Sequence, residues 1–129
     1  MAIDPAALPQ EVIDFLQERH LATLTTLRAD GSPHVVAVGF SYDPAERVAR
    51  VISFGGSQKT KNAERGGRAV VCQVDGPRWL ALEGAVRLVT DEAGVQRAVE
   101  GYATRYRQPG PRPGRVAIEI AVDRILGRG

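Results

Sequence analysis

The sequence predicts a small, mainly β protein, an antiparallel barrel with helices at its periphery. Six stretches alternate apolar and polar residues or are rich in β-branched side chains, and short turns join most of them. Asp-Gly pairs at residues 30–31 and 75–76 are strong hairpin signals. A parallel sheet would need a helical crossover after each strand, so these short turns favour an antiparallel arrangement.

The chain opens with a short amphipathic helix. Val12, Phe15 and Leu16 recur at helical spacing within "PQEVIDFLQERH", and Pro9 suits a first helical turn. After His20 the pattern becomes β-like. Six strands are expected, at residues 21–28, 34–42, 48–54, 68–74, 79–89 and 115–126.

Two further helices are expected between strands. Ser57 is a natural N-cap for a helix over residues 58–65, and Gly66 or Gly67 is a natural stop. A longer helix follows the fifth strand and ends before the loop "QPGPRPG". Its N-cap is Thr90 or Asp91, and its apolar face carries Val95, Val99, Tyr102 and Tyr106.

Length and composition indicate one domain, residues 1–129. The chain is 43% hydrophobic and 25% charged, it has no apolar run of the roughly 20 residues that a membrane span needs, and it opens without a signal-peptide pattern. A net charge of +2 and 5% aromatic residues give no support to nucleic-acid binding. The single cysteine, Cys72, suits a reducing compartment, so we expect a cytoplasmic protein without a membrane segment.

No set of residues for catalysis or metal binding is recognisable. Cys72 lies within the β run "RAVVCQV", where a packed thiol is expected, and no His or Cys stands at metal-ligand spacing. His20 and His34 have structural or solvent roles by default. If the protein is an enzyme, a bound cofactor therefore carries its chemistry.

Both lysines, Lys59 and Lys61, lie in the stretch "GGSQKTKNAERGGR", whereas the other 15 basic residues are arginines spread along the chain. The start of a helix with a lysine beside it is suited to a phosphate group. A solvated connector whose lysines face water explains the same stretch equally well. These residues alone leave both interpretations open.

The order of motifs resembles the split β-barrel flavin and deazaflavin oxidoreductases, the pyridoxamine 5'-phosphate oxidase-like superfamily. The stretches "LATLTTLRADGSPHVVAVGF", "VARVISF", "GGSQKTKNAERGGRAVVCQVDG" and "RWLALEGAVRLVTD" carry this resemblance, which extends from about residue 10 to the end. The phrases "HLATLTTLRADGSPHVVAVGF", "GGSQK" and "RYRQPGPRP" resemble the branch that uses coenzyme F420, and within it the biliverdin reductases.

The resemblance implies a six-stranded split barrel that forms a homodimer, with the cofactor in a groove at the interface. The second strand would lie against the flat ring, and the stretch with both lysines would hold the phosphate and the acidic tail. The implied cofactor residues are His34, Val36, Ala37, Val38 and Gly39 along the ring, Ile52, Ser53 and Phe54 beside it, Gln58, Lys59 and Asn62 at the phosphate, and Gln73 and Trp79 as further contacts.

The implied reaction is hydride transfer from reduced deazaflavin to a conjugated substrate, biliverdin being converted to bilirubin. No residue is assigned as the proton donor. Ser57 stands where many relatives carry an arginine, and Lys61 or Arg65 is the expected substitute. The alternatives are an FMN-dependent oxidase or reductase on the same fold, and a protein that binds deazaflavin, flavin or haem without turnover.

Overall fold

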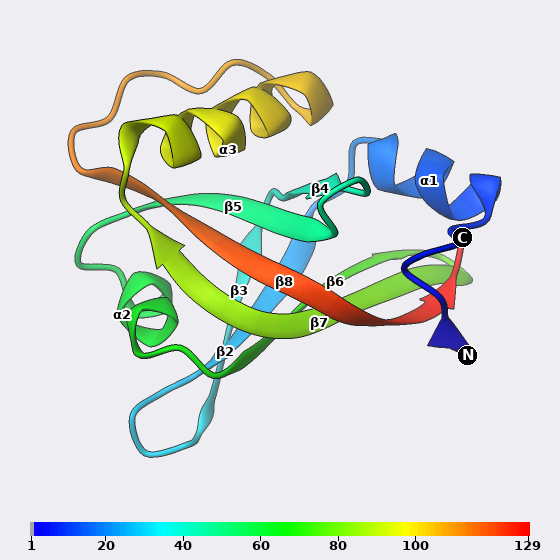
Figure 1. The fold of residues 1–129 in the computed structure, drawn as a ribbon, viewed down its shortest axis with the longest axis horizontal. Coiled ribbons are helices and arrows are strands. Elements are labelled where there is room, and N and C mark those ends of the chain that lie inside the picture. Colours follow the sequence, from blue (N-terminus) through cyan, green and yellow to red (C-terminus); the bar gives the residue numbers. More distant parts are fainter. Residues whose placement is uncertain (1) are drawn as a thin grey trace.

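The computed structural model describes residues 2–129 as one curled antiparallel sheet with three helices around it (Figure 1). Helix α3 lies over β5, and α1 lies beside both chain ends (Figure 1). The elements are β1 (Ala2–Ile3), α1 (Gln10–Gln17), β2 (Ala22–Leu27), β3 (Pro33–Val38), β4 (Ser41–Asp43), β5 (Val48–Phe54), α2 (Gln58–Arg65), β6 (Arg68–Asp75), β7 (Arg78–Val89), α3 (Glu92–Arg105) and β8 (Arg115–Arg128).

The eight strands form one sheet in the order β3-β2-β6-β7-β8-β5-β4, with β1 added to β8. All pairs are antiparallel, as predicted, and five of the six predicted strands are present as single strands. The sheet does not close. Its two edge strands, β3 and β4, follow each other in the chain, so the barrel is split between them.

The predicted strand 34–42 is therefore two strands rather than one. Residues 33–38 pair with β2, whereas Ser41–Asp43 pair with β5 on the other edge. The chain crosses between the edges at Gly39 and Phe40. A Cβ atom at Gly39 would lie 2.9 Å from the Tyr102 ring and 3.1 Å from the Tyr106 ring, so only glycine lets these rings lie against the crossing.

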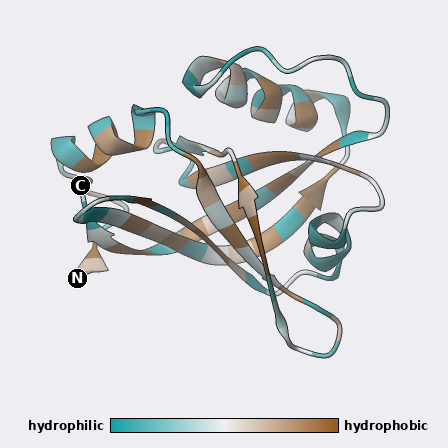
Figure 2. Cartoon of the chain, turned by 180° about the vertical axis from the view of Figure 1, so that it is seen from behind, coloured by the Kyte–Doolittle hydropathy of each residue, from teal (hydrophilic) through white to brown (hydrophobic). Residues whose placement is uncertain are grey.

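The interior of the barrel is apolar. Buried and more exposed residues alternate along β2 and along much of β7, and the strands carry most of the hydrophobic colour in Figure 2. Helix α1 contributes Val12, Phe15 and Leu16 to this core, as its spacing predicted. Helix α2 is hydrophilic over nearly its whole length (Figure 2), and Ala63 is the residue of α2 that joins the apolar core, so polar contacts must hold much of the helix.

The helix ends differ slightly from those predicted. Helix α1 ends at Gln17, so His20 lies beyond it. Asp91 caps α3 by accepting from the Gly94 N–H at 2.9 Å, and α3 ends at Arg105, which leaves Tyr106 just past its last turn. None of the helices in residues 2–129 combines the length and the apolar character needed to cross a membrane.

Candidate cofactor site

The first turn of α2 is fastened to the end of β5 by a group of hydroxyls. Ser57 caps the helix by accepting from the Thr60 N–H at 3.3 Å, and the Thr60 hydroxyl donates to the Phe54 carbonyl at 2.8 Å. Ser53 is buried on β5 and lies 2.8 Å from the same Thr60 hydroxyl. The predicted N-cap is thus confirmed, and the cap fixes the first helical turn, on which Lys59 lies.

Asn62 anchors α2 to the sheet. Its side chain is 1% exposed, and its amide nitrogen donates to the Thr26 hydroxyl of β2 at 2.9 Å. Its amide oxygen accepts from Gln58 at 2.8 Å and from Arg65 at 2.8 Å. Because these partners occupy the Asn62 amide, it fixes the helix from within. Of the three predicted phosphate residues, Lys59 has the side chain that faces a cavity.

That cavity has a volume of about 190 Å³ and lies at the end of β5. The guanidinium carbon of Arg112 lies 3.7 Å from the centre of the Phe54 ring, and the Lys59 ammonium lies 5.4 Å from it. Both distances suit cation–π contact, so the ring holds the two cations near each other. The lining residues are Ile52, Ser53, Phe54, Lys59, Arg112 and Arg115.

The cavity is strongly positive. No carboxylate among residues 2–129 forms an ion pair with Lys59, Arg112 or Arg115. Burial lowers the pKa of the Lys59 ammonium, and the nearby charge of Arg112 lowers this pKa further. Three cations without a counter-charge repel one another, and a bound anion would relieve that repulsion. The cavity is therefore suited to a phosphate or a carboxylate.

Arg112 and Arg115 were not among the predicted site residues. They reach Phe54 because β8 pairs with β5, with Arg115 opposite Phe54, and because the Gly55 N–H donates to the Gly114 carbonyl at 3.1 Å. The sequence signal was only the composition of the loop "QPGPRPG", which says nothing about the strand that this loop approaches.

The predicted ring-binding strand is the edge strand β3. His34, Val36 and Val38 lie opposite buried residues of β2, so they share the inner face of the sheet, whereas Ala37 lies on the outer face. The Nδ1 atom of His34 is buried and has no hydrogen-bond partner among residues 2–129. A buried polar atom without a partner costs free energy, so a hydrogen bond between this nitrogen and a ligand would be favourable.

The remaining two predicted residues lie apart. Gln73 is fully buried, donating to the Phe15 carbonyl at 3.1 Å and accepting from Arg105 at 2.6 Å, so its amide serves the core of this chain. Trp79 lies on the outer face of β7 and is 37% exposed. Only a ligand or partner outside the barrel could reach Trp79.

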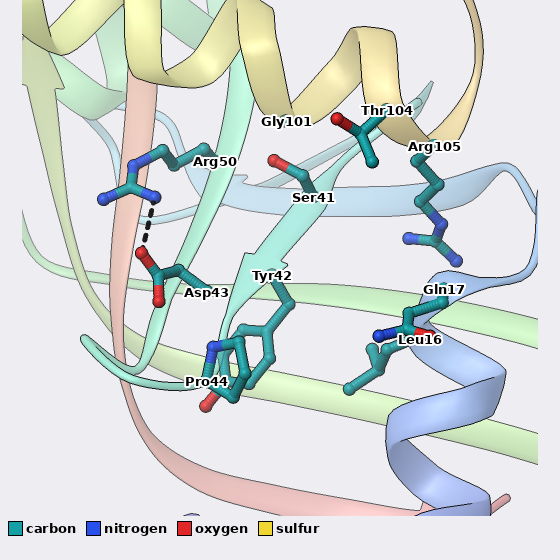
Figure 3. A pocket seen from close by; sticks show the side chains of 10 residues that line it. All are labelled: Leu16, Gln17, Ser41, Tyr42, Asp43, Pro44, Arg50, Gly101, Thr104 and Arg105. Carbon is teal, nitrogen blue, oxygen red and sulfur yellow. Dashed lines mark hydrogen bonds and ion pairs between the residues drawn. The ribbon is translucent and has the colours of Figure 1, made fainter.

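A larger cavity, about 360 Å³, lies between α1, β4 and α3 (Figure 3). Arg50 points toward Asp43 across it, with 3.2 Å between the guanidinium and the carboxylate, and also pairs with the buried Glu119 at 3.1 Å. Arg105 donates to the Phe40 and Glu18 carbonyls at 2.9 and 2.8 Å. The charged groups here are already paired, so this cavity has little attraction for an anion.

One surface cluster has the composition of a metal site. Ligand atoms of Glu18, His20 and Asp75 lie within 4.8 Å of one another. However, Arg78 contacts both carboxylates, donating to Glu18 through two nitrogens at 2.9 Å each. A cation thus already occupies the position that a metal ion would need, and the cluster is an ion-pair network.

A family model for pyridoxamine 5'-phosphate oxidase matches residues 8–129. The chain belongs to this family. A solved structure of a conserved hypothetical protein from Mycobacterium tuberculosis has a TM-score of 0.79 at 23% identity, over 95% of this chain and 84% of the other. The mainly β split barrel and the family resemblance predicted from the sequence are confirmed.

Two relatives carry functional names. An F420H(2)-dependent biliverdin reductase of Mycobacterium tuberculosis (strain CDC 1551 / Oshkosh) is 58% identical over 120 residues, or 93% of this chain and 88% of the relative. A structure described as an F420 reductase has a TM-score of 0.70 at 26% identity, over 88% of this chain and 94% of the other. In this oxidase family, deazaflavin-dependent members are thus among the proteins similar to the chain.

Proposed function

We propose that the protein is a coenzyme F420-dependent reductase that converts biliverdin to bilirubin. The observation that carries this proposal is the 58% identity, over 93% of the chain, to an F420H(2)-dependent biliverdin reductase. The cations beside α2, which form no ion pair among residues 2–129, supply what a phosphate-bearing cofactor requires.

The residues present fit such a cofactor. Lys59 and Arg112 would hold its phosphate, with Arg115 near enough to meet a carboxylate of its tail. When bound, reduced F420 supplies a hydride to an electrophilic carbon of the substrate. The apolar residues Ile52 and Phe54 would exclude water from one side of the cofactor, and His34 offers a buried nitrogen to a polar edge.

We further propose that two chains form a homodimer through the outer face of the sheet. Val35, Val74 and Trp79 are exposed on this face, at 57%, 62% and 37%. Pairing between strands joins them into one surface, since Thr25 lies opposite both Val35 and Val70, and Val74 lies opposite Trp79. Thr23, Ala37, Cys72 and Ala81 lie on the same face, and its margin carries Glu83, opposite Val70, which pairs with Arg68 at 3.6 Å and Arg124 at 3.5 Å.

A second copy of the chain is the partner that best fits the outer face. An apolar surface of this kind is typical of an interface, and burial raises the pKa of Cys72 within it, so this residue stays a neutral thiol. Trp79 would then extend toward the partner, consistent with its expected contact across the interface. The lone cysteine agrees with a reducing cytoplasm as the place of action.

The test is a turnover assay with purified protein. Reduced F420 is added with biliverdin, and reoxidation of the cofactor is followed together with the appearance of bilirubin; parallel samples contain FMN instead. We expect stoichiometric bilirubin formation with F420. If the protein binds reduced F420 but biliverdin does not oxidise it, the protein is a carrier and not an enzyme. If it binds FMN and not F420, the flavin-dependent alternative is favoured.

A further inference from the structure

A cavity of about 350 Å³ lies where the end of α3 approaches the segment between α1 and β2. It is lined by Arg19, Leu21, Tyr102, Tyr106 and Arg107. It shares no lining residue with the cavity at Lys59. None of its residues was predicted to bind the cofactor.

The aromatic wall of this cavity is rigidly held. The Tyr106 hydroxyl donates to the His20 carbonyl at 2.5 Å and accepts from the Phe40 N–H at 3.2 Å. The Tyr102 ring lies beside it, with 4.9 Å between the ring centres. Both rings pack against Gly39, the last of the residues expected to lie along the cofactor ring. The cavity thus lies at one end of the row of residues expected to line that ring.

The two arginines of this cavity are free to bind a ligand. Neither Arg19 nor Arg107 forms a hydrogen bond or ion pair with another of residues 2–129, in contrast to Arg50 and Arg105 of the larger cavity. Leu21, which is 68% exposed, lies at the same place and offers an apolar contact to a ligand. Two free guanidinium groups, a fixed aromatic wall and an exposed leucine favour a flat, conjugated ligand that carries carboxylates.

We infer that this cavity binds the substrate, and that Arg19 and Arg107 hold the two propionate carboxylates of a linear tetrapyrrole. The inference rests on the proposed function for the identity of the substrate. The apolar pyrrole rings would contact Leu21 and the tyrosine rings, and the conjugated centre of the molecule would extend past Gly39 toward the cofactor. In this arrangement the cavity at Lys59 binds the cofactor, and the cavity at Arg19 and Arg107 binds the substrate.

The test compares biliverdin with biliverdin dimethyl ester, in which both carboxylates are neutral. Binding is measured by absorbance titration, and KM and kcat by oxidation of reduced F420. We expect the wild-type protein to prefer the acid, and the double variant Arg19→Gln/Arg107→Gln to lose that preference, with KM for biliverdin raised about tenfold or more. Affinity for F420 should not change. Arg97→Gln, on the exposed side of α3, is the matched control and should behave as wild type.

Each outcome bears on the inference separately from the proposed function. If the wild-type protein does not distinguish acid from ester, or if the double variant keeps the distinction, the inference is wrong. If biliverdin binds through the two arginines but never oxidises reduced F420, the proposed function fails while the arginine site stands. If biliverdin does not bind at all, both fail.

Discussion

At the scale of single residues, Lys59 and Lys61 carry the same charge but differ in their surroundings. Its neighbour Lys61 is exposed on the same helix, yet Lys59 shares a cavity with Arg112 beside the Phe54 ring. Arg65, one of the two residues expected to supply a further cation beside Lys59, instead donates to the Leu27 carbonyl at 2.7 Å. The cation that shares the cavity and the Phe54 ring with Lys59 is Arg112, from a loop distant in the sequence.

Lys59→Ala should weaken binding of F420 about tenfold or more, because it removes a charge-assisted contact to phosphate. Fluorescence titration of the oxidised cofactor measures this, and the melting temperature should change little. Lys61→Ala is the matched control and should leave the affinity within about twofold. Equal losses in both variants would mean that only net charge matters and that Lys59 has no specific role.

The ion-pair network at Glu18 should give the protein a measurable dependence on acid pH. Hydrogen bonds from Arg78 and then from His20 lower the pKa of Glu18 from 4.5 to about 2. Because the folded-state pKa is the lower one, the stabilisation is complete above the unfolded value and is lost as pH falls toward about 2. Glu18→Gln should therefore be less stable than wild type near neutral pH, and this difference should shrink below about pH 4.

Urea unfolding at a series of pH values measures that difference. Glu64→Gln, an exposed position on α2 without an ion pair among the described residues, is the control and should show no such trend. A difference between Glu18→Gln and wild type that stays constant from neutral to acid pH would contradict the assignment.

At the scale of elements, α2 is a polar helix that one buried amide, that of Asn62, ties to β2, in addition to the hydroxyls that fasten its first turn to β5. Asn62→Ala would leave the Thr26 hydroxyl and the Gln58 amide without their partner, which costs about 1–3 kcal/mol of unfolding free energy. We also expect weaker F420 binding, because Lys59 moves with the helix. Chemical denaturation and cofactor titration measure both effects. Glu64→Ala on the exposed side should change stability by no more than about 0.5 kcal/mol.

If Asn62→Ala matched wild type in stability, the buried hydrogen bond to Thr26 would not be what holds α2.

Residue choice within the strands also depends on the strand that lies alongside. Gly84, within the "LEG" phrase, lies at a bulge between β7 and β8, where a Cβ atom would come within 1.8 Å of the Ala121 carbonyl oxygen. The sequence marks this glycine, but only strand pairing explains why no side chain fits there.

At the scale of the whole molecule, the outer face predicts dimerisation. Val74→Arg should shift the protein from dimer to monomer in sedimentation velocity, because it places a charge on the exposed apolar surface, opposite Trp79. It should also weaken F420 binding, if the site lies at the interface. Ala93→Arg, exposed on α3 away from that face, should leave the assembly unchanged. A wild-type protein that sediments as a monomer would overturn the proposed dimer.

The sequence by itself determined the secondary structure, the antiparallel fold class and the resemblance to an oxidoreductase family. These features depend on periodicity and on turn residues, which are local, so α2 with its Ser57 cap and the Asp30-Gly31 hairpin could be predicted. The family motifs extended this to a cofactor and to Lys59. They could not distinguish side chains that meet a cavity from those, such as Asn62 and Gln73, that hold the chain together.

Only the tertiary structure decided which residues from distant segments meet. The strand expected over residues 34–42 divides because its second part pairs with β5 at the opposite edge of the sheet. Arg112 and Lys59 line one cavity because β8 pairs with β5. Arg19 and Arg107 line another because the end of α3 lies near the segment before β2. Such contacts join residues far apart in the chain through pairing and packing, and no local pattern of charges or glycines encodes them.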